Sequence, residues 1–150
     1  MSIPCLFEDR FEVRSVDCSK FERVSRLKGK SSGFDADIQL DVNSDLFPVK
    51  EKQRLYIGIT NNLHSTSDAR KDDTAAWTEP AAYLKEYDYV MYGKIFRIEE
   101  CSSERRTLYA SFGGLLMALT ADKHVVGDLE LDMRIYILIR RSEEVHSLLA

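Results

Sequence analysis

Residues 34–42 read FDADIQLDV, and this alternation is the strongest indication of the fold class. Phenylalanine, alanine, isoleucine, leucine and valine occupy every second position, with aspartate or glutamine between them. Side chains along a β-strand point alternately to the two faces of a sheet, so a period of two predicts a half-buried strand. The apolar side faces a core, and the acidic side faces water.

Similar β-rich runs recur on both sides of this stretch. Turn-like residues separate them, such as Lys28–Gly33, Asn43–Asp45 and Ser102–Glu104, and no long helical period alternates with them. We therefore predict an all-β domain, with a closed or nearly closed antiparallel barrel as the leading architecture, because closure removes unpaired edges. The pattern alone fits a sandwich as well. The further strand candidates are Phe21–Leu27, Arg54–Thr60, Tyr89–Ile98, Thr107–Phe112, Leu115–Thr120 and Arg134–Arg140.

The composition is that of one ordinary globular domain, residues 1–150. Apolar residues make up 44% and charged residues 31% of the chain, and the formal net charge is −4. Three widely spaced cysteines suit a reducing compartment, and neither a leader nor an apolar run suggests secretion or contact with a membrane. Residues 61–86 lack a period and predict a long, mobile, irregular loop, and 142–150 a short C-terminal tail.

Catalytic constellations are absent from the sequence. His64, His124 and His146 are isolated, and no phosphate-binding, nucleophile-elbow or metalloprotease motif occurs. The aspartates of the 34–42 stretch, at 35, 37 and 41, would share one strand face and could hold a divalent metal, which leaves a metal-dependent hydrolase as an alternative. Alternation explains the same acids as the wet side of a strand, so we expect no catalytic site, cofactor or metal.

A basic strip beside one aromatic residue raises the possibility of nucleic-acid binding. Small barrels grip single strands with aromatic side chains next to positive charge. The same cations also protect a solvated strand edge against aggregation, and the net charge of −4 favours this second interpretation. The strip comprises Phe21, Arg23, Arg26, Lys28 and Lys30.

A tyrosine-rich segment is the candidate partner interface. Tyrosine and methionine are enriched in protein interfaces, and they also pack barrel cores, so each position alone fits either role. As a group, the seven tyrosines of the chain favour some partner contact. The candidate interface residues are Tyr87, Tyr89, Met91, Tyr92 and Lys94.

Two glycines interrupt a pair of apolar runs near the C-terminal third of the chain. Gly113 and Gly114 follow Ser111-Phe112 and precede Leu115-Leu116. Glycine adopts positive φ at no steric cost, so the pair predicts a tight hairpin turn or a bulge.

Six blocks of the sequence, in order, resemble the small common subunit of the nuclear RNA polymerases I, II and III, usually called the eighth subunit of RNA polymerase II. The resemblance extends from about Leu6 to Arg141. The blocks are Leu6–Asp9 with Phe11 and Val13; Phe21 with Arg23–Leu27; Leu40–Asn43 leading to Pro48-Val49; Tyr87–Lys94; Ser111–Met117; and Tyr136–Arg141.

This resemblance implies an eight-stranded antiparallel barrel related to the oligonucleotide/oligosaccharide-binding fold. It implies a non-catalytic structural or assembly subunit of the nucleus and nucleolus, docked mainly on the largest polymerase subunit. Nucleotide addition in such enzymes belongs to the largest subunits, so this chain would support transcription only within the complex. The alternative is a free-standing module that binds single-stranded nucleic acid, and a weak contact of that kind is compatible with the subunit role.

Overall fold

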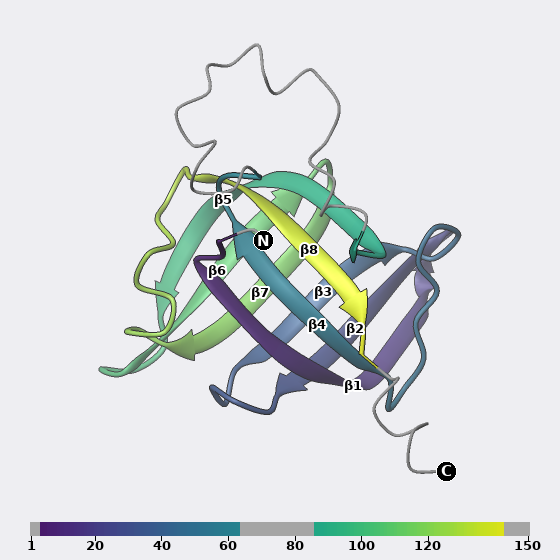
Figure 1. Ribbon diagram of the computed structural model, residues 1–150, viewed down its shortest axis with the longest axis horizontal. Helices are drawn as coiled ribbons and strands as arrows, with labels where there is room; N and C mark the ends of the chain where they lie inside the picture. The colour runs from purple at the N-terminus through teal and green to yellow at the C-terminus, as the bar shows by residue number, and fades with distance from the viewer. Residues whose placement is uncertain (1–3, 64–85, 143–150) are drawn as a thin grey trace.

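The computed structural model describes residues 4–63 and 86–142, which form one closed antiparallel barrel (Figure 1). Its strands close in the order β1-β2-β3-β7-β6-β5-β8-β4. This confirms the predicted all-β class and the closed barrel. The eight strands are β1 (Phe7–Phe21), β2 (Val24–Ser31), β3 (Asp37–Asn43), β4 (Arg54–Thr60), β5 (Tyr89–Glu100), β6 (Arg105–Phe112), β7 (Leu115–Asp122) and β8 (Arg134–Arg141).

The first strand, β1, is not among the strands predicted from the sequence. β1 runs through 15 residues and pairs with β4 through its first half and with β2 through its second. A register shift between Val13 and Ser15 changes which positions face the core, so the apolar residues of β1 do not keep a period of two. The prediction that a strand begins at Phe21 was wrong: Phe21 is the last residue of β1 and pairs with Val24, the first residue of β2.

Two predicted boundaries around residues 28–37 also need correction. Lys28–Ser31 belong to β2 rather than to a turn, and Gly29 is buried in the barrel wall, where an added Cβ would lie 3.1 Å from a backbone oxygen of β1. The strand predicted from Phe34 begins at Asp37 instead. Asp35 has φ of 54°, and hydrogen bonds between Ser31 and residue 36 close a turn there.

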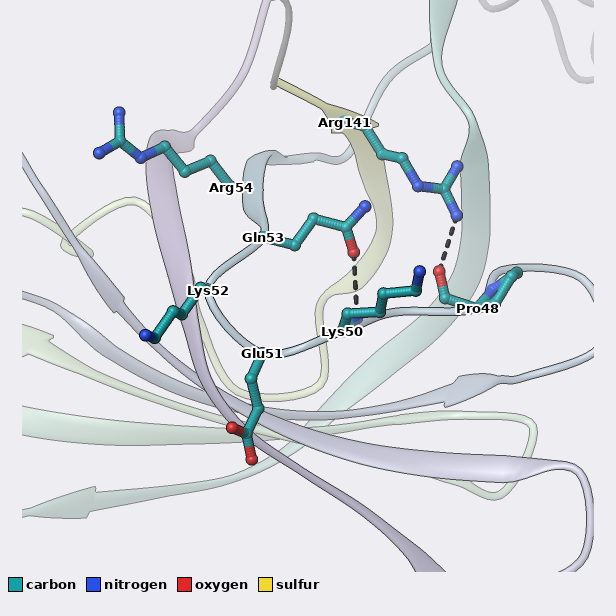
Figure 2. Close-up of a pocket in the computed structure, with 7 residues that line it drawn as sticks. All are labelled: Pro48, Lys50, Glu51, Lys52, Gln53, Arg54 and Arg141. Carbon is teal, nitrogen blue, oxygen red and sulfur yellow. Dashed lines mark hydrogen bonds between the residues drawn. The ribbon is translucent and has the colours of Figure 1, made fainter. Parts of the chain in front are cut away.

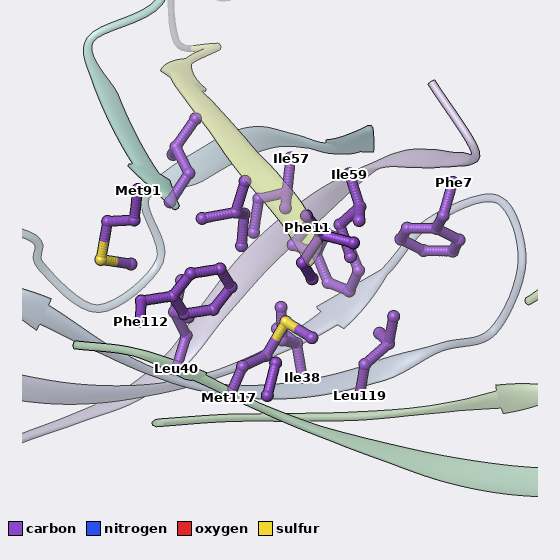
Figure 3. Packing of buried hydrophobic residues seen from close by; sticks show 14 of the residues in the cluster. Phe7, Phe11, Ile38, Leu40, Ile57, Ile59, Met91, Phe112, Met117 and Leu119 are labelled. Carbon is purple, nitrogen blue, oxygen red and sulfur yellow. The ribbon is translucent and has the colours of Figure 1, made fainter. Parts of the chain in front are cut away.

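The inside of the barrel is filled with apolar side chains from all eight strands (Figure 3). Aromatic rings, methionines and branched aliphatic residues interdigitate, as expected for a small barrel whose interior holds side chains rather than a channel. Residues labelled in the figure are Phe7, Phe11, Ile38, Leu40, Ile57, Ile59, Met91, Phe112, Met117 and Leu119.

One end of the barrel is closed by Phe47, which follows β3 and is fully buried. Its ring stacks on that of Tyr89 with a centroid separation of 5.1 Å. The guanidinium carbon of Arg141, on β8, lies 4.3 Å from the centre of the Phe47 ring. Arg141 also donates a hydrogen bond of 2.7 Å to the Pro48 carbonyl. The loop between β3 and β4 is thereby fixed to the ends of β5 and β8. In the part of the chain the structure describes, no helix is long and apolar enough to cross a membrane.

Candidate partner-binding surface

The candidate interface residues on β5 divide between the two sides of the barrel wall. Tyr89 and Met91 point inward and are only 9% exposed, whereas Val90, Tyr92 and Lys94 point outward. Burial raises the pKa of the Tyr89 hydroxyl, which accepts a hydrogen bond of 2.9 Å from the backbone N–H of Asn43. Tyr89 and Met91 therefore belong to the core, while Tyr92 and Lys94 are available on the surface.

The outward residues of β5 join those of its neighbours in an exposed aromatic face. Tyr92 is 49% exposed, and its ring lies 4.6 Å from that of Tyr136, the residue of β8 that pairs with it in the sheet. Phe96, also 49% exposed, lies 6.3 Å from the ring of Tyr109 on β6. We call this surface the aromatic face; it comprises Val90, Tyr92, Phe96, Tyr109 and Tyr136.

Tyr87 lies in a second cluster on the outer side of β4 and β8. Its ring is 6.2 Å from that of Tyr56, and the Arg140 guanidinium lies over both rings at 5.5 and 4.7 Å. Burial raises the pKa of both tyrosines, and the Tyr56 hydroxyl donates to Glu8. Tyr136 and Arg140 are four residues apart on β8, so the two clusters are about 13 Å apart on the same outer wall.

The cations of the predicted nucleic-acid strip are mostly paired with carboxylates. Arg23 lies 3.4 Å from Asp45, and Lys30 lies 2.7 Å from the Asp35 carboxylate, which holds the pKa of that carboxyl below its usual range. Arg26 forms a bidentate ion pair with Asp41. Lys28 has no such partner among the described residues, and Phe21 is 60% exposed. Little of the strip's positive charge is uncompensated.

The three aspartates weighed as a metal site do not share a strand face, which corrects that expectation. Asp35 lies in the turn before β3, whereas Asp37 begins the strand. Asp41 is buried, accepts hydrogen bonds of 2.6 and 3.0 Å from Arg26, and accepts a third from the backbone N–H of Leu116. Its carboxylate thus holds β2, β3 and β7 together at the point where the pairing of β3 with β7 ends.

The glycine pair forms the two-residue connection between β6 and β7. Phe112 pairs with Leu115, and Gly113 and Gly114 have φ of 64° and 102°. Positive φ at both central residues is the geometry of the turns that suit the twist of a hairpin.

Sequence reasoning missed one further site, a basic cup in the loop before β4 (Figure 2). A signal was present, since Lys50, Lys52 and Arg54 recur at every second position. Arg141, which completes the cup, is 87 positions further along the chain, and only the fold brings it there. The cup residues are Pro48, Lys50, Glu51, Lys52, Gln53, Arg54 and Arg141.

The fold is a closed antiparallel barrel with an apolar interior, and Tyr92 and Phe96 are among the large side chains exposed on its outer wall. Residues 8–141 match the sequence family described as RNA polymerase Rpb8, and the chain belongs to that family.

Curated relatives in several organisms cover nearly the whole chain. The "DNA-directed RNA polymerases I, II, and III subunit rpabc3" of Dictyostelium discoideum is 39% identical over 91% of this chain and 97% of its own length. The subunit RPABC3 of Schizosaccharomyces pombe is 38% identical over 94% and 100%, and that of Saccharomyces cerevisiae 36% over 91% and 97%. A solved structure of the molybdate-binding protein ModG aligns with a TM-score of only 0.34 and 10% identity, too weak a likeness to inform fold or function.

Proposed function

We propose that this chain is a non-catalytic structural or assembly subunit shared by the nuclear DNA-directed RNA polymerases I, II and III. The observation that carries the proposal is its membership of the RNA polymerase Rpb8 family, together with relatives that match over nearly their whole length and are named as subunits of all three enzymes. The chain then acts in the nucleus, including the nucleolus, and supports DNA-templated transcription as one part of the complex.

The partner in this proposal is the largest polymerase subunit, and the docking surface is the aromatic face with Lys94 beside it. Two features support the choice. Tyr92 and Phe96 expose about half of their surface, and exposed aromatic groups are the usual anchors of protein interfaces. Val90, also exposed, precedes Tyr92 on the outward side of β5, and grouped exposed apolar side chains mark interaction sites more often than single ones do.

The absence of chemistry in the chain itself is the second part of the proposal. The Asp37 carboxylate is 3.6 Å from Arg105 and 3.4 Å from Lys30, which also pairs with Asp35, so both exposed aspartates are engaged in ion pairs. Replacing Asp35 and Asp37 together with asparagine, while keeping the buried Asp41, should leave RNA synthesis by the assembled enzyme unchanged. Loss of magnesium-dependent synthesis in a complex that still contains the folded variant would contradict this part.

The decisive test is the native complex. A tagged copy of the chain, purified from nuclei of its own organism under mild conditions, should retain the largest subunits of all three polymerases when the bound proteins are identified by mass spectrometry. Retention of single-stranded nucleic acid without any polymerase subunit would favour the free-standing binding module instead. Recovery of neither class would overturn the proposal.

A further inference from the structure

The basic cup surrounds a cavity of about 680 Å³ beside the end of the barrel that Phe47 closes. Among the described residues, four cationic side chains and one carboxylate line it. Figure 2 shows Lys50 between Gln53 and Arg141, with Lys52 and Arg54 extending from the other side of the loop and Glu51 directed away from the rest. The Gln53 side chain accepts a 3.1 Å hydrogen bond from the Lys50 N–H, which holds the loop in this shape.

No ion pair among the described residues compensates the positive charge of the cup. Lys50, Lys52 and Arg54 are exposed, and none of them forms an ion pair within residues 4–63 and 86–142. Arg141 is engaged through its hydrogen bond to Pro48 and its stacking on Phe47, contacts that leave its charge in place. Clefts lined by one sign of charge concentrate the field and attract ligands of the opposite sign.

A second depression, of about 320 Å³, extends the cup along β1 and shares Arg54 with it. Its additional cations are Arg10, Arg14 and Lys30, of which Arg14 lies 3.0 Å from Glu12 and Lys30 2.7 Å from Asp35. We call the two depressions together the basic tract. Its exposed cations without an ion pair among the described residues are Lys50, Lys52 and Arg54 in the cup and Arg10 in the second depression.

We propose that the basic cup binds an acidic segment of a partner protein, whose carboxylates pair with Lys50, Lys52 and Arg54. Arginine presents a planar fork of donors that matches a carboxylate, and lysine adds mobile charge. This inference rests on the proposed function, because it assumes that the chain works by docking on other proteins. It adds a second contact surface to the aromatic face and states the chemistry of the segment that occupies it.

The lining of the tract favours protein over nucleic acid. Non-specific binding of single strands needs exposed aromatic side chains on which bases stack. Among the described residues, the only aromatic residue lining either depression is Phe11, which is 1% exposed and belongs to the core. The net charge of −4 on the whole chain also opposes binding to a long polyanion, whereas a short acidic segment meets only the local positive tract.

Fluorescence anisotropy of the purified full-length chain tests the inference with a labelled glutamate-rich peptide as probe. The same peptide with glutamine in place of glutamate, and a single-stranded DNA oligonucleotide of equal charge, are the comparison probes. The test variant is Lys50→Glu/Lys52→Glu, with the charge-neutral Lys50→Gln/Lys52→Gln beside it. The matched control is Lys28→Glu/Arg134→Glu, which reverses two exposed cations outside the tract that also lack an ion pair among the described residues.

The expected result is saturable binding of the glutamate peptide to the wild-type chain. Lys50→Glu/Lys52→Glu should weaken this binding about tenfold or more, and Lys50→Gln/Lys52→Gln should weaken it less. The control variant should bind the peptide nearly as well as the wild type. All three variants should melt with the wild type, because the exchanged side chains are exposed. Equal losses in the test and control variants, or tighter binding of the oligonucleotide than of the peptide, would overturn the inference. Because this assay uses the isolated chain, failure of peptide binding with retained polymerase co-purification refutes the cup alone, and the opposite pattern refutes the proposed function.

Discussion

Tyr89 and Tyr92 make a matched pair of mutations that separates folding from docking. They lie on the same strand and face opposite sides of the barrel wall. We expect Tyr89→Ala to destabilise the isolated chain with its surface intact. Tyr92→Ala should leave the isolated chain folded and weaken its assembly into the polymerase.

The magnitude for Tyr89 follows from its contacts. Removing a buried aromatic side chain costs about 3–5 kcal/mol. Here the change also removes a ring stacked on Phe47 at 5.1 Å and the acceptor for the Asn43 N–H at 2.9 Å. For a domain of this size, a loss of that order lowers the melting temperature by roughly 10 °C or more. Tyr89→Phe keeps the ring and removes only the hydroxyl, so it should cost about 1–3 kcal/mol.

The expectation for Tyr92 is different because half of its surface is exposed and its ring contacts that of Tyr136 at a centroid separation of 4.6 Å. An aromatic pair of this kind contributes about 0.5–1.5 kcal/mol to stability. An interface anchor costs about 2 kcal/mol or more on truncation, which is roughly a thirtyfold loss of affinity.

Two measurements on each variant test this reasoning: the melting temperature of the isolated chain by calorimetry, and the fraction that co-purifies with the largest polymerase subunits. A Tyr89→Ala chain that melts with the wild type would show that the ring does not close the barrel end. A Tyr92→Ala chain that melts normally and assembles normally would remove the aromatic face from the docking surface.

Three further predictions concern backbone geometry and cysteine reactivity. Gly93→Ala places a Cβ 2.1 Å from the Ser111 carbonyl oxygen, so β5 and β6 must separate. The free energy of unfolding should fall by about 3 kcal/mol. An unchanged denaturant midpoint would refute this close approach. Gly113→Val forces a branched residue to φ near 64° and should cost about 1–2 kcal/mol, with equal unfolding free energies for variant and wild type as the contrary result. Burial raises the pKa of the Cys5 thiol to about 11, so its thiolate becomes abundant only as the pH rises toward that value. Alkylation of Cys5 near neutral pH should therefore be much slower than alkylation of the exposed Cys18. Equal alkylation rates, measured by mass spectrometry, would contradict this prediction.

β4 and the last two strands, β7 and β8, could be predicted from the sequence almost to the residue. β4 has the predicted bounds, and β7 and β8 begin where the pattern places them and extend by one or two residues. In these strands apolar side chains keep the period of two, and turn residues bound them. Local chemistry and fold agree there, so the pattern is sufficient.

The N-terminal strands were predicted less well for an identifiable reason. The register shifts in β1 break the alternation, and the Lys-Gly-Lys run in β2 has the composition of a turn. Gly29 lies in a strand because β1 passes too close for a side chain, which is a condition set by a neighbouring strand. The strand predicted over residues 34–42 was too long at its N-terminal end, because Phe34 and Asp35 follow the alternation but lie in a turn.

The candidate site depended on information that a period of two does not contain. Alternation places Tyr89 and Met91 on one side and Tyr92 on the other, but a shift of pairing by one residue exchanges the sides. The predicted interface therefore mixed core and surface residues. The predicted loop at 61–86 and tail at 142–150 lie largely outside the described residues and remain predictions.

The sequence by itself determined the β character of the chain, the apolar side of most strands and membership of one family, because side-chain alternation and short blocks of residues are local properties. Tertiary structure alone decided how the barrel closes: β1 pairs with β4, β3 with β7 and β4 with β8, across long separations in the chain. Backbone hydrogen bonds are the same for every residue type, so side-chain identity does not name the partner strand. That closure sets the face on which Tyr92 lies and brings Arg141 beside Lys50.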